Sequence, residues 1–249
     1  MNQHTVKAYG DELNQLTAEV ARMGGLAEAQ VADAVESVAR RDIALARAVV
    51  ERDAKVDAMH RDIEKKAIRL IALRQPVASD LRKTLAAMKL SVDLERTGDL
   101  AKNIAKRALS LAETEPMQPL TRSIERMGKL VSMRLRDVLD AYTASEIDRA
   151  MAVWASDDEV DEHYNALFRE LLTYMMGDPR TISACTHLLF MAKNLERIGD
   201  HATNIAEVIH YEITGDEMTG ERPRWTPSPG DWDADSGHLP TPPTTTPTS

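Results

Sequence analysis

Apolar residues recur along the chain at the spacing of an α-helix, and turn signals divide them into six long segments. After a polar lead-in of ten residues, the first half predicts helices over about residues 11–40, 43–73 and 77–111. The second half repeats this pattern over about residues 120–142, 145–176 and 179–213. Helices of this length should pack nearly antiparallel around their apolar stripes.

Capping residues and prolines mark the boundaries of these segments. We expect Asp42 and Asp178 as N-caps, Pro76 and Pro179 at first helical positions, and a capping box of Ser145 and Asp148 at the start of the fifth helix. The stretch from Glu113 to Pro119 is the best candidate for a linker. From residue 215 onward Pro, Thr, Gly and Asp dominate, which predicts a disordered tail.

One phrase occurs twice in the chain. The first copy begins at Leu94 and the second at Leu195, 101 residues later, and both read L-E-R-x-G-D-x-A-x-N-I-A. A repeat of this length indicates an internal duplication. We therefore predict an all-α fold of two tandem antiparallel three-helix bundles, residues 1–114 and 115–214, followed by the tail at residues 215–249.

Composition narrows the class of protein. Aromatic residues make up only 4% of the chain, which favours helices, and the net charge of −9 argues against a nucleic-acid partner. Residues 1–113 carry 19 Lys and Arg against 17 Asp and Glu, so residues 114–249 carry the remaining 12 against 23. The single Cys185 reads as a small buried hydrophobe, and the lack of a signal-peptide core or a long apolar run predicts a cytoplasmic protein.

Each half of the chain carries two pairs of carboxylates at a spacing of four residues. This spacing puts both members of a pair on one helix face. The repeated phrase supplies one pair, and the preceding helix supplies the other: Glu95 with Asp99 and Asp53 with Asp57 in the first half, and Glu196 with Asp200 and Asp157 with Asp161 in the second.

The register of an antiparallel hairpin brings the pairs to one level. If the first hairpin turns near position 75.5, Asp57 lies level with residue 94 and Asp53 with residue 98. If the second turns near position 178, residues 161 and 157 lie level with residues 195 and 199. Each half should therefore hold four carboxylates in one layer, about 28 Å from its turn.

Four carboxylates in one layer repel one another unless they are protonated or bridged by a cation. Oxygen ligands of this kind suit Mg²⁺, Mn²⁺, Ca²⁺ or iron, so we predict a metal site in each half. Asn103 and Asn204 could add a carbonyl ligand or orient a carboxylate. Alternatively, Arg96 and Arg197 could neutralise the carboxylates as ordinary salt bridges of the helix surface.

The glycine of each phrase lies in mid-helix, where Gly costs about 1 kcal/mol relative to Ala. Because this cost occurs twice, at Gly98 and Gly199, we expect each glycine to give room to an ion or to a close helix. His60 and His201 lie beside the carboxylates. Each could contribute to a site, but we expect surface histidines.

The duplicated phrase, the D-x-x-x-D pair on the preceding helix and the two three-helix units resemble the PhoU family. The segments His4–Leu13 and Arg74–Arg82 are also typical of that family, and the resemblance covers about residues 4–213. Family members can bind metal at paired E(D)-x-x-x-D motifs, which correspond here to Glu95/Asp99 and Glu196/Asp200 with the aspartate pairs facing them. Glu51 and Ala155 break the repeat beside these pairs, so the two sites need not be equal.

The resemblance implies a cytoplasmic and usually dimeric regulator. Such a protein restrains the phosphate-starvation response and phosphate uptake as an adaptor between the ATPase subunit of a phosphate ABC transporter and a sensor histidine kinase. The chain offers no persuasive catalytic constellation, which favours a protein that is not an enzyme. The alternatives are a metal-dependent phosphoester hydrolase that uses the carboxylates and a purely structural bundle with solvated acidic stripes.

Overall fold

The computed structural model describes residues 3–115, 117–156 and 158–218. The predicted tail lies outside the described residues from position 219 onward. In the described part the chain forms seven α-helices and a 3₁₀ turn, and no strand. Their bounds are α1 Gln3–Arg40, α2 Ile43–Arg74, α3 Ala78–Leu111, α4 Gln118–Ala144, α5 Ile147–Ala155, α6 Asp158–Gly177, η1 Pro179–Thr181 and α7 Ile182–Thr214.

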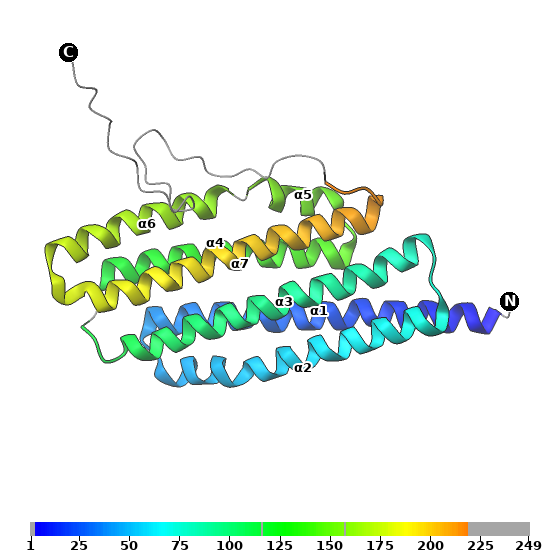
Figure 1. Ribbon diagram of the computed structural model, residues 1–249, viewed down its shortest axis with the longest axis horizontal. Coiled ribbons are helices and arrows are strands. Elements are labelled where there is room, and N and C mark those ends of the chain that lie inside the picture. Colours follow the sequence, from blue (N-terminus) through cyan, green and yellow to red (C-terminus); the bar gives the residue numbers. More distant parts are fainter. Residues whose placement is uncertain (1–2, 116, 157, 219–249) are drawn as a thin grey trace, which may run out of the picture.

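The helices form two three-helix units that lie side by side. The first unit consists of α1, α2 and α3, and the second of α4, α7 and the pair α5–α6. Figure 1 shows α2 along one edge of the molecule and α5 and α6 along the opposite edge. The inner helices join the units, because α3 packs against α7 and α1 packs against α4. The predicted all-α fold of two tandem bundles is confirmed.

One continuous core runs through both units. Val20 and Met23 on α1, Leu94 on α3, and Leu195 and Ile198 on α7 are fully buried within it. Burial of a side chain of this size contributes about 1.5–3 kcal/mol. The core therefore stabilises the join between the units as well as each unit. Cys185 is buried in this core, as expected.

Two of the predicted caps are confirmed. The Asp42 side chain accepts a hydrogen bond of 2.9 Å from the Leu45 backbone N–H at the start of α2. Asp178 accepts one of 3.0 Å from the Arg180 backbone N–H, and Pro179 opens the 3₁₀ turn before α7.

Other predicted boundaries are wrong. The first helix begins at Gln3 and not near residue 11, because the lead-in contains no proline and the helix continues through Gly10. Pro76 lies in the turn instead of at the first helical position, since Gln75 caps α2 in the left-handed conformation and α3 begins only at Ala78. Ser145 caps the end of α4 at φ 54° and makes no capping box, since its N–H donates to the carbonyls of Ala141 and Tyr142.

The predicted fifth helix is interrupted. It forms α5 and α6, with the break after Ala155. At the break, the carbonyl of Ser156 accepts a hydrogen bond from the guanidinium of Arg134, a buried residue of α4. The apolar periodicity continues across the break, so the pattern alone does not reveal it.

Candidate functional site

The four carboxylates of the first unit lie together on α2 and α3. We call Asp53, Asp57, Glu95 and Asp99 the first acidic cluster. Burial raises the pKa of Glu95, and the charges of Asp99, Asp57 and Asp53 raise it further, while His60 lowers it. A Cβ atom at Gly98 would lie 3.4 Å from Asp53 Oδ1, which confirms the register that the hairpin predicts.

A lysine lies between two members of this cluster. The Nζ atom of Lys102 donates to Asp53 Oδ2 at 2.5 Å and also to Asp99 Oδ1. Although burial lowers the pKa of Lys102, its hydrogen bonds to the two aspartates outweigh this effect and raise the pKa above its ordinary value. Sequence reasoning missed Lys102, and its position three residues after Asp99 was the available signal.

The first helix also contributes to the cluster. Gln30 of α1 is fully buried, and its Nε2 atom donates to Asp53 Oδ1 at 3.3 Å and to the Gly98 carbonyl at 3.2 Å. Its Oε1 atom is buried and has no hydrogen-bond partner within the described residues. Three helices therefore meet at Asp53, whereas the sequence indicated two.

The glycines of the repeated phrase allow close packing of a neighbouring helix. A Cβ atom at Gly98 would lie 3.2 Å from Val56 Cγ1 of α2. A Cβ atom at Gly199 would lie 3.4 Å from Val160 Cγ1 of α6. The expectation of a close helix is confirmed at both positions.

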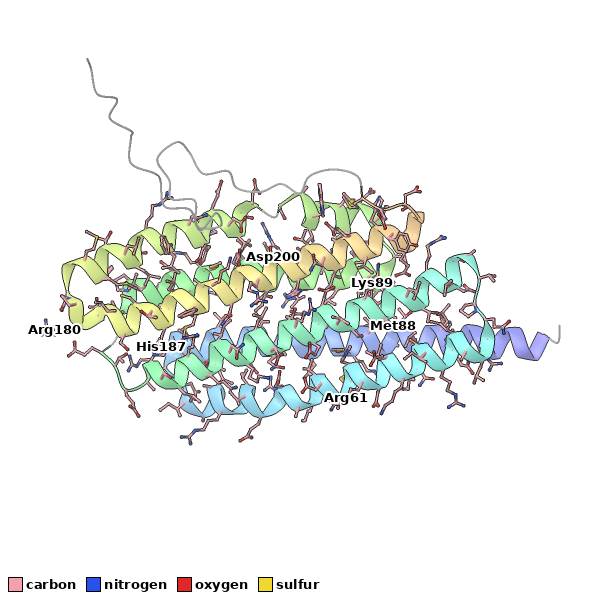
Figure 2. The ribbon with its side chains drawn as sticks, in the orientation of Figure 1. Arg61, Met88, Lys89, Arg180, His187 and Asp200 are labelled. Carbon is pink, nitrogen blue, oxygen red and sulfur yellow. The ribbon has the colours of Figure 1, made fainter. Side chains whose placement is uncertain are left out.

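The second unit holds a corresponding group on α6 and α7. Of its predicted members the structure describes Asp161, Glu196 and Asp200, and Asp157 lies outside the described residues. Burial raises the pKa of Glu196, Lys193 opposes this shift through a hydrogen bond of 2.8 Å, and the charges of Asp200 and Asp161 add to it. Figure 2 shows Asp200 near the middle of α7.

The predicted supporting residues lie at different depths. Asn103 is exposed, and so are Arg96 and Arg197. Asn204 is partly buried, and its amide nitrogen donates to Asp93 Oδ1 of α3 at 3.3 Å. Lys102 and Lys193 are therefore hydrogen-bonded to cluster carboxylates, whereas the arginines of the phrase lie at the surface.

His201 is not the surface residue that we expected. It is 7% exposed, and its Nδ1 atom lies 2.8 Å from Asp93 Oδ1. This contact joins α7 to α3 across the boundary between the units. The partner Asp93 lies outside the repeated phrase, so the phrase does not indicate it. The other histidine, His60, is partly buried, and its Nδ1 atom lies 3.0 Å from Ser91 Oγ.

The donor atoms of the clusters have the chemistry of a hard-metal site, but their arrangement does not fit one. Among the residues that the structure describes, no three His, Cys, Asp or Glu side chains are gathered so that they could hold a metal ion. In the first cluster, Lys102 Nζ lies where a cation bound by both Asp53 and Asp99 would lie. The metal role of the eight carboxylates stays a prediction.

Comparison with known proteins gives matches along most of the chain. The model of the PhoU domain matches residues 20–108 and 124–209, so each unit holds one copy. A protein of Caulobacter vibrioides named phosphate-specific transport system accessory protein PhoU homolog is 69% identical over 90% of this chain and 97% of its own length. A protein of the same name in Rhizobium meliloti is 49% identical over 89% of this chain and 93% of its own length.

Solved structures agree with these sequences. The crystal structure of PhoU from Pseudomonas aeruginosa has a TM-score of 0.81 and 39% identity, and the match covers 84% of this chain and all of that one. The phosphate transport system regulatory protein PhoU from Streptococcus pneumoniae has a TM-score of 0.79 and 30% identity over 85% of this chain and 99% of that one. In the described part of this chain, none of the helices has the length and apolar character needed to cross a bilayer.

The PhoU domain model matches both units, and a relative named PhoU homolog is 69% identical along most of the chain. The chain therefore belongs to the PhoU family.

Proposed function

We propose that this chain is an accessory protein of a phosphate transport system and a negative regulator of the phosphate-starvation response and phosphate uptake. The observation that carries this proposal is the match of both units to the PhoU domain, together with 69% identity to a phosphate-specific transport system accessory protein along 90% of the chain. Similarity of this extent includes the surfaces of the molecule as well as its core.

The proposed mode of action is that of a cytoplasmic adaptor and not of an enzyme. Its partners are the ATPase subunit of the phosphate ABC transporter and the sensor histidine kinase of the phosphate regulon. We expect the protein to be a homodimer and to reach the membrane only through these partners. An adaptor needs exposed surfaces of distinct chemistry rather than a catalytic cleft.

A surface suited to docking lies on α3 and α7. These helices run side by side between α2 and α6 (Figure 1). Val92 on α3 and Phe190 on α7 are 37% and 47% exposed, so both helices present apolar surface to solvent. The arginine of each repeated phrase, Arg96 and Arg197, is also exposed on these helices. We call these four residues the repeat face.

A binding measurement with purified partners tests the adaptor role. We expect the chain to bind the transporter ATPase subunit, and Arg96→Glu combined with Arg197→Glu to weaken this binding by about tenfold or more, since rim charges steer association. Arg61→Glu is the matched control, because Arg61 is exposed on the outer helix α2 (Figure 2). Equal affinity in all three proteins would exclude the repeat face, and absence of binding in the unmodified chain would contradict the adaptor role.

A further inference from the structure

Two positions of the repeat carry a basic residue in one unit and a neutral residue in the other. Asp57 and Asp161 are 104 residues apart, and the same offset relates Gln30 on α1 to Arg134 on α4. The offset of 101 that relates the two phrases pairs Lys102 with Thr203. Each unit thus has one basic residue at these two positions. It comes from the third helix in the first unit and from the first helix in the second.

In the first unit the basic residue is in contact with the cluster. Lys102 hydrogen-bonds Asp53, whose side chain is only 6% exposed, and Asp99. Gln30, the neutral residue of this unit, binds the other oxygen of Asp53 through its amide nitrogen. A buried carboxylate that loses its cation is costly, so Lys102 compensates the charge that α2 places in the core.

In the second unit the basic residue contacts groups other than the described carboxylates of the predicted cluster. Arg134 is 3% exposed, and its Nη2 atom donates to the Ser156 carbonyl and to Glu159 Oε2 at 3.2 Å. Thr203, the neutral residue of this unit, is 1% exposed, and its hydroxyl donates to the Gly199 carbonyl at 3.3 Å. A lysine at position 203 would bring a second buried cation to this level.

We propose that Lys102 is the resident cation of the first acidic cluster and stands where a metal ion would otherwise bridge Asp53 and Asp99. The geometry supports this inference, because one ammonium group contacts both carboxylates while Gln30 binds the other oxygen of Asp53. Asp53 and Asp99 then share a cation without a divalent ion. This inference goes beyond the proposed function, and neither depends on the other.

Melting temperature with chelator and with Mn²⁺ tests the proposal on the full chain. We expect a change from EDTA to excess Mn²⁺ to raise the melting temperature of Lys102→Thr more than that of the unmodified chain, since a ligand that binds only the folded state raises it. Lys102→Thr introduces the residue of the second unit and should lower the melting temperature in EDTA. Lys106→Thr is the control, since Lys106 is exposed one turn further along the same helix.

Two further measurements keep the test decisive if Lys102→Thr folds poorly. Adding Asp53→Asn to Lys102→Thr removes the buried charge and should restore the melting temperature of the variant in EDTA. By calorimetric titration, Lys102→Thr should bind Mn²⁺ about tenfold more tightly than the unmodified chain, because the freed carboxylates can bind the ion. The proposal is overturned if Mn²⁺ raises the melting temperatures of the two proteins equally, if Lys102→Thr melts like the control in EDTA, or if the two proteins bind Mn²⁺ equally.

Discussion

Gly128 of α4 packs directly against Val35 of α1, so that a Cβ atom at position 128 would lie 2.5 Å from Val35 Cγ2. The repeat produces the reciprocal contact 104 residues away, where a Cβ atom at Gly24 of α1 would lie 2.5 Å from Leu139 Cδ2 of α4. Two glycines at equivalent positions thus set how closely the inner helices of the units approach. The duplication is visible in the interface between the units as well as in the sequence.

Gly128→Ala should destabilise the protein. Overpacking against Val35 costs about 1–3 kcal/mol, which outweighs the gain in helix propensity of about 1 kcal/mol. Urea denaturation measures the change in the free energy of unfolding. Gly25→Ala is the control, because no described atom of another helix lies within 4 Å of its added Cβ and the variant should be slightly stabilised. Equal effects of the two substitutions would show that the contact with Val35 does not limit the interface.

The buried pair Asp93–His201 should stabilise the join between the units. His201→Leu, which introduces the residue at the equivalent position 100, removes one hydrogen-bond partner of the buried Asp93 and leaves Asn204, so it should cost about 1–3 kcal/mol. Adding Asp93→Asn, the residue at equivalent position 194, should recover most of this loss. A double-mutant cycle in urea measures the coupling, and additive effects would mean that the two side chains do not interact.

Glu212 should make stability depend on pH. Burial raises the pKa of Glu212 from 4.5 to about 7, against the charges of Lys83 and Arg82, which lower it. Because the folded state disfavours the charged form, the penalty is absent below the ordinary pKa, grows as pH rises toward 7, and is complete above it. Glu212→Gln should therefore raise the free energy of unfolding by up to about 3 kcal/mol more at about pH 8 than at about pH 4.5.

Urea denaturation at the two pH values checks this prediction. Glu64→Gln on α2 is the control, because Glu64 is exposed. An effect of Glu212→Gln that stays constant with pH would show that the charge of Glu212 carries no penalty in the folded state.

Binding of a divalent cation to the first acidic cluster should depend equally on the carboxylates of α2 and those of α3. Replacing Asp53 and Asp57 with alanine should abolish Mn²⁺ binding by Lys102→Thr as fully as replacing Glu95 and Asp99, since the hairpin places the two pairs in one layer. Calorimetric titration of the two sets of variants measures this. A site lost only with Glu95 and Asp99 would contradict the paired-helix arrangement. Turnover of a phosphoester with Mn²⁺, abolished by Asp99→Ala, would instead favour the hydrolase.

The sequence alone predicts much of the fold because the repeated phrase, the turns and the apolar stripes each carry a local signal. The hairpin register likewise predicts the layer of Asp57 and Glu95, since α-helices have a fixed rise per residue. It does not reveal Gln30 or the Asp93–His201 pair, because these contacts depend on how a third helix or the second unit packs. The interruption before α6 was missed for the same reason, since Arg134 of another helix binds the carbonyl at the break.

Transcription from a phosphate-regulated promoter in a strain that lacks this chain tests the proposed function most directly. With phosphate plentiful, we predict that deletion raises expression well above that of the parent strain and that the unmodified gene restores repression. The Arg96→Glu, Arg197→Glu variant should fail to restore it, while Arg61→Glu should succeed. Unchanged expression in the deletion strain, under both plentiful and scarce phosphate, would contradict the regulatory role.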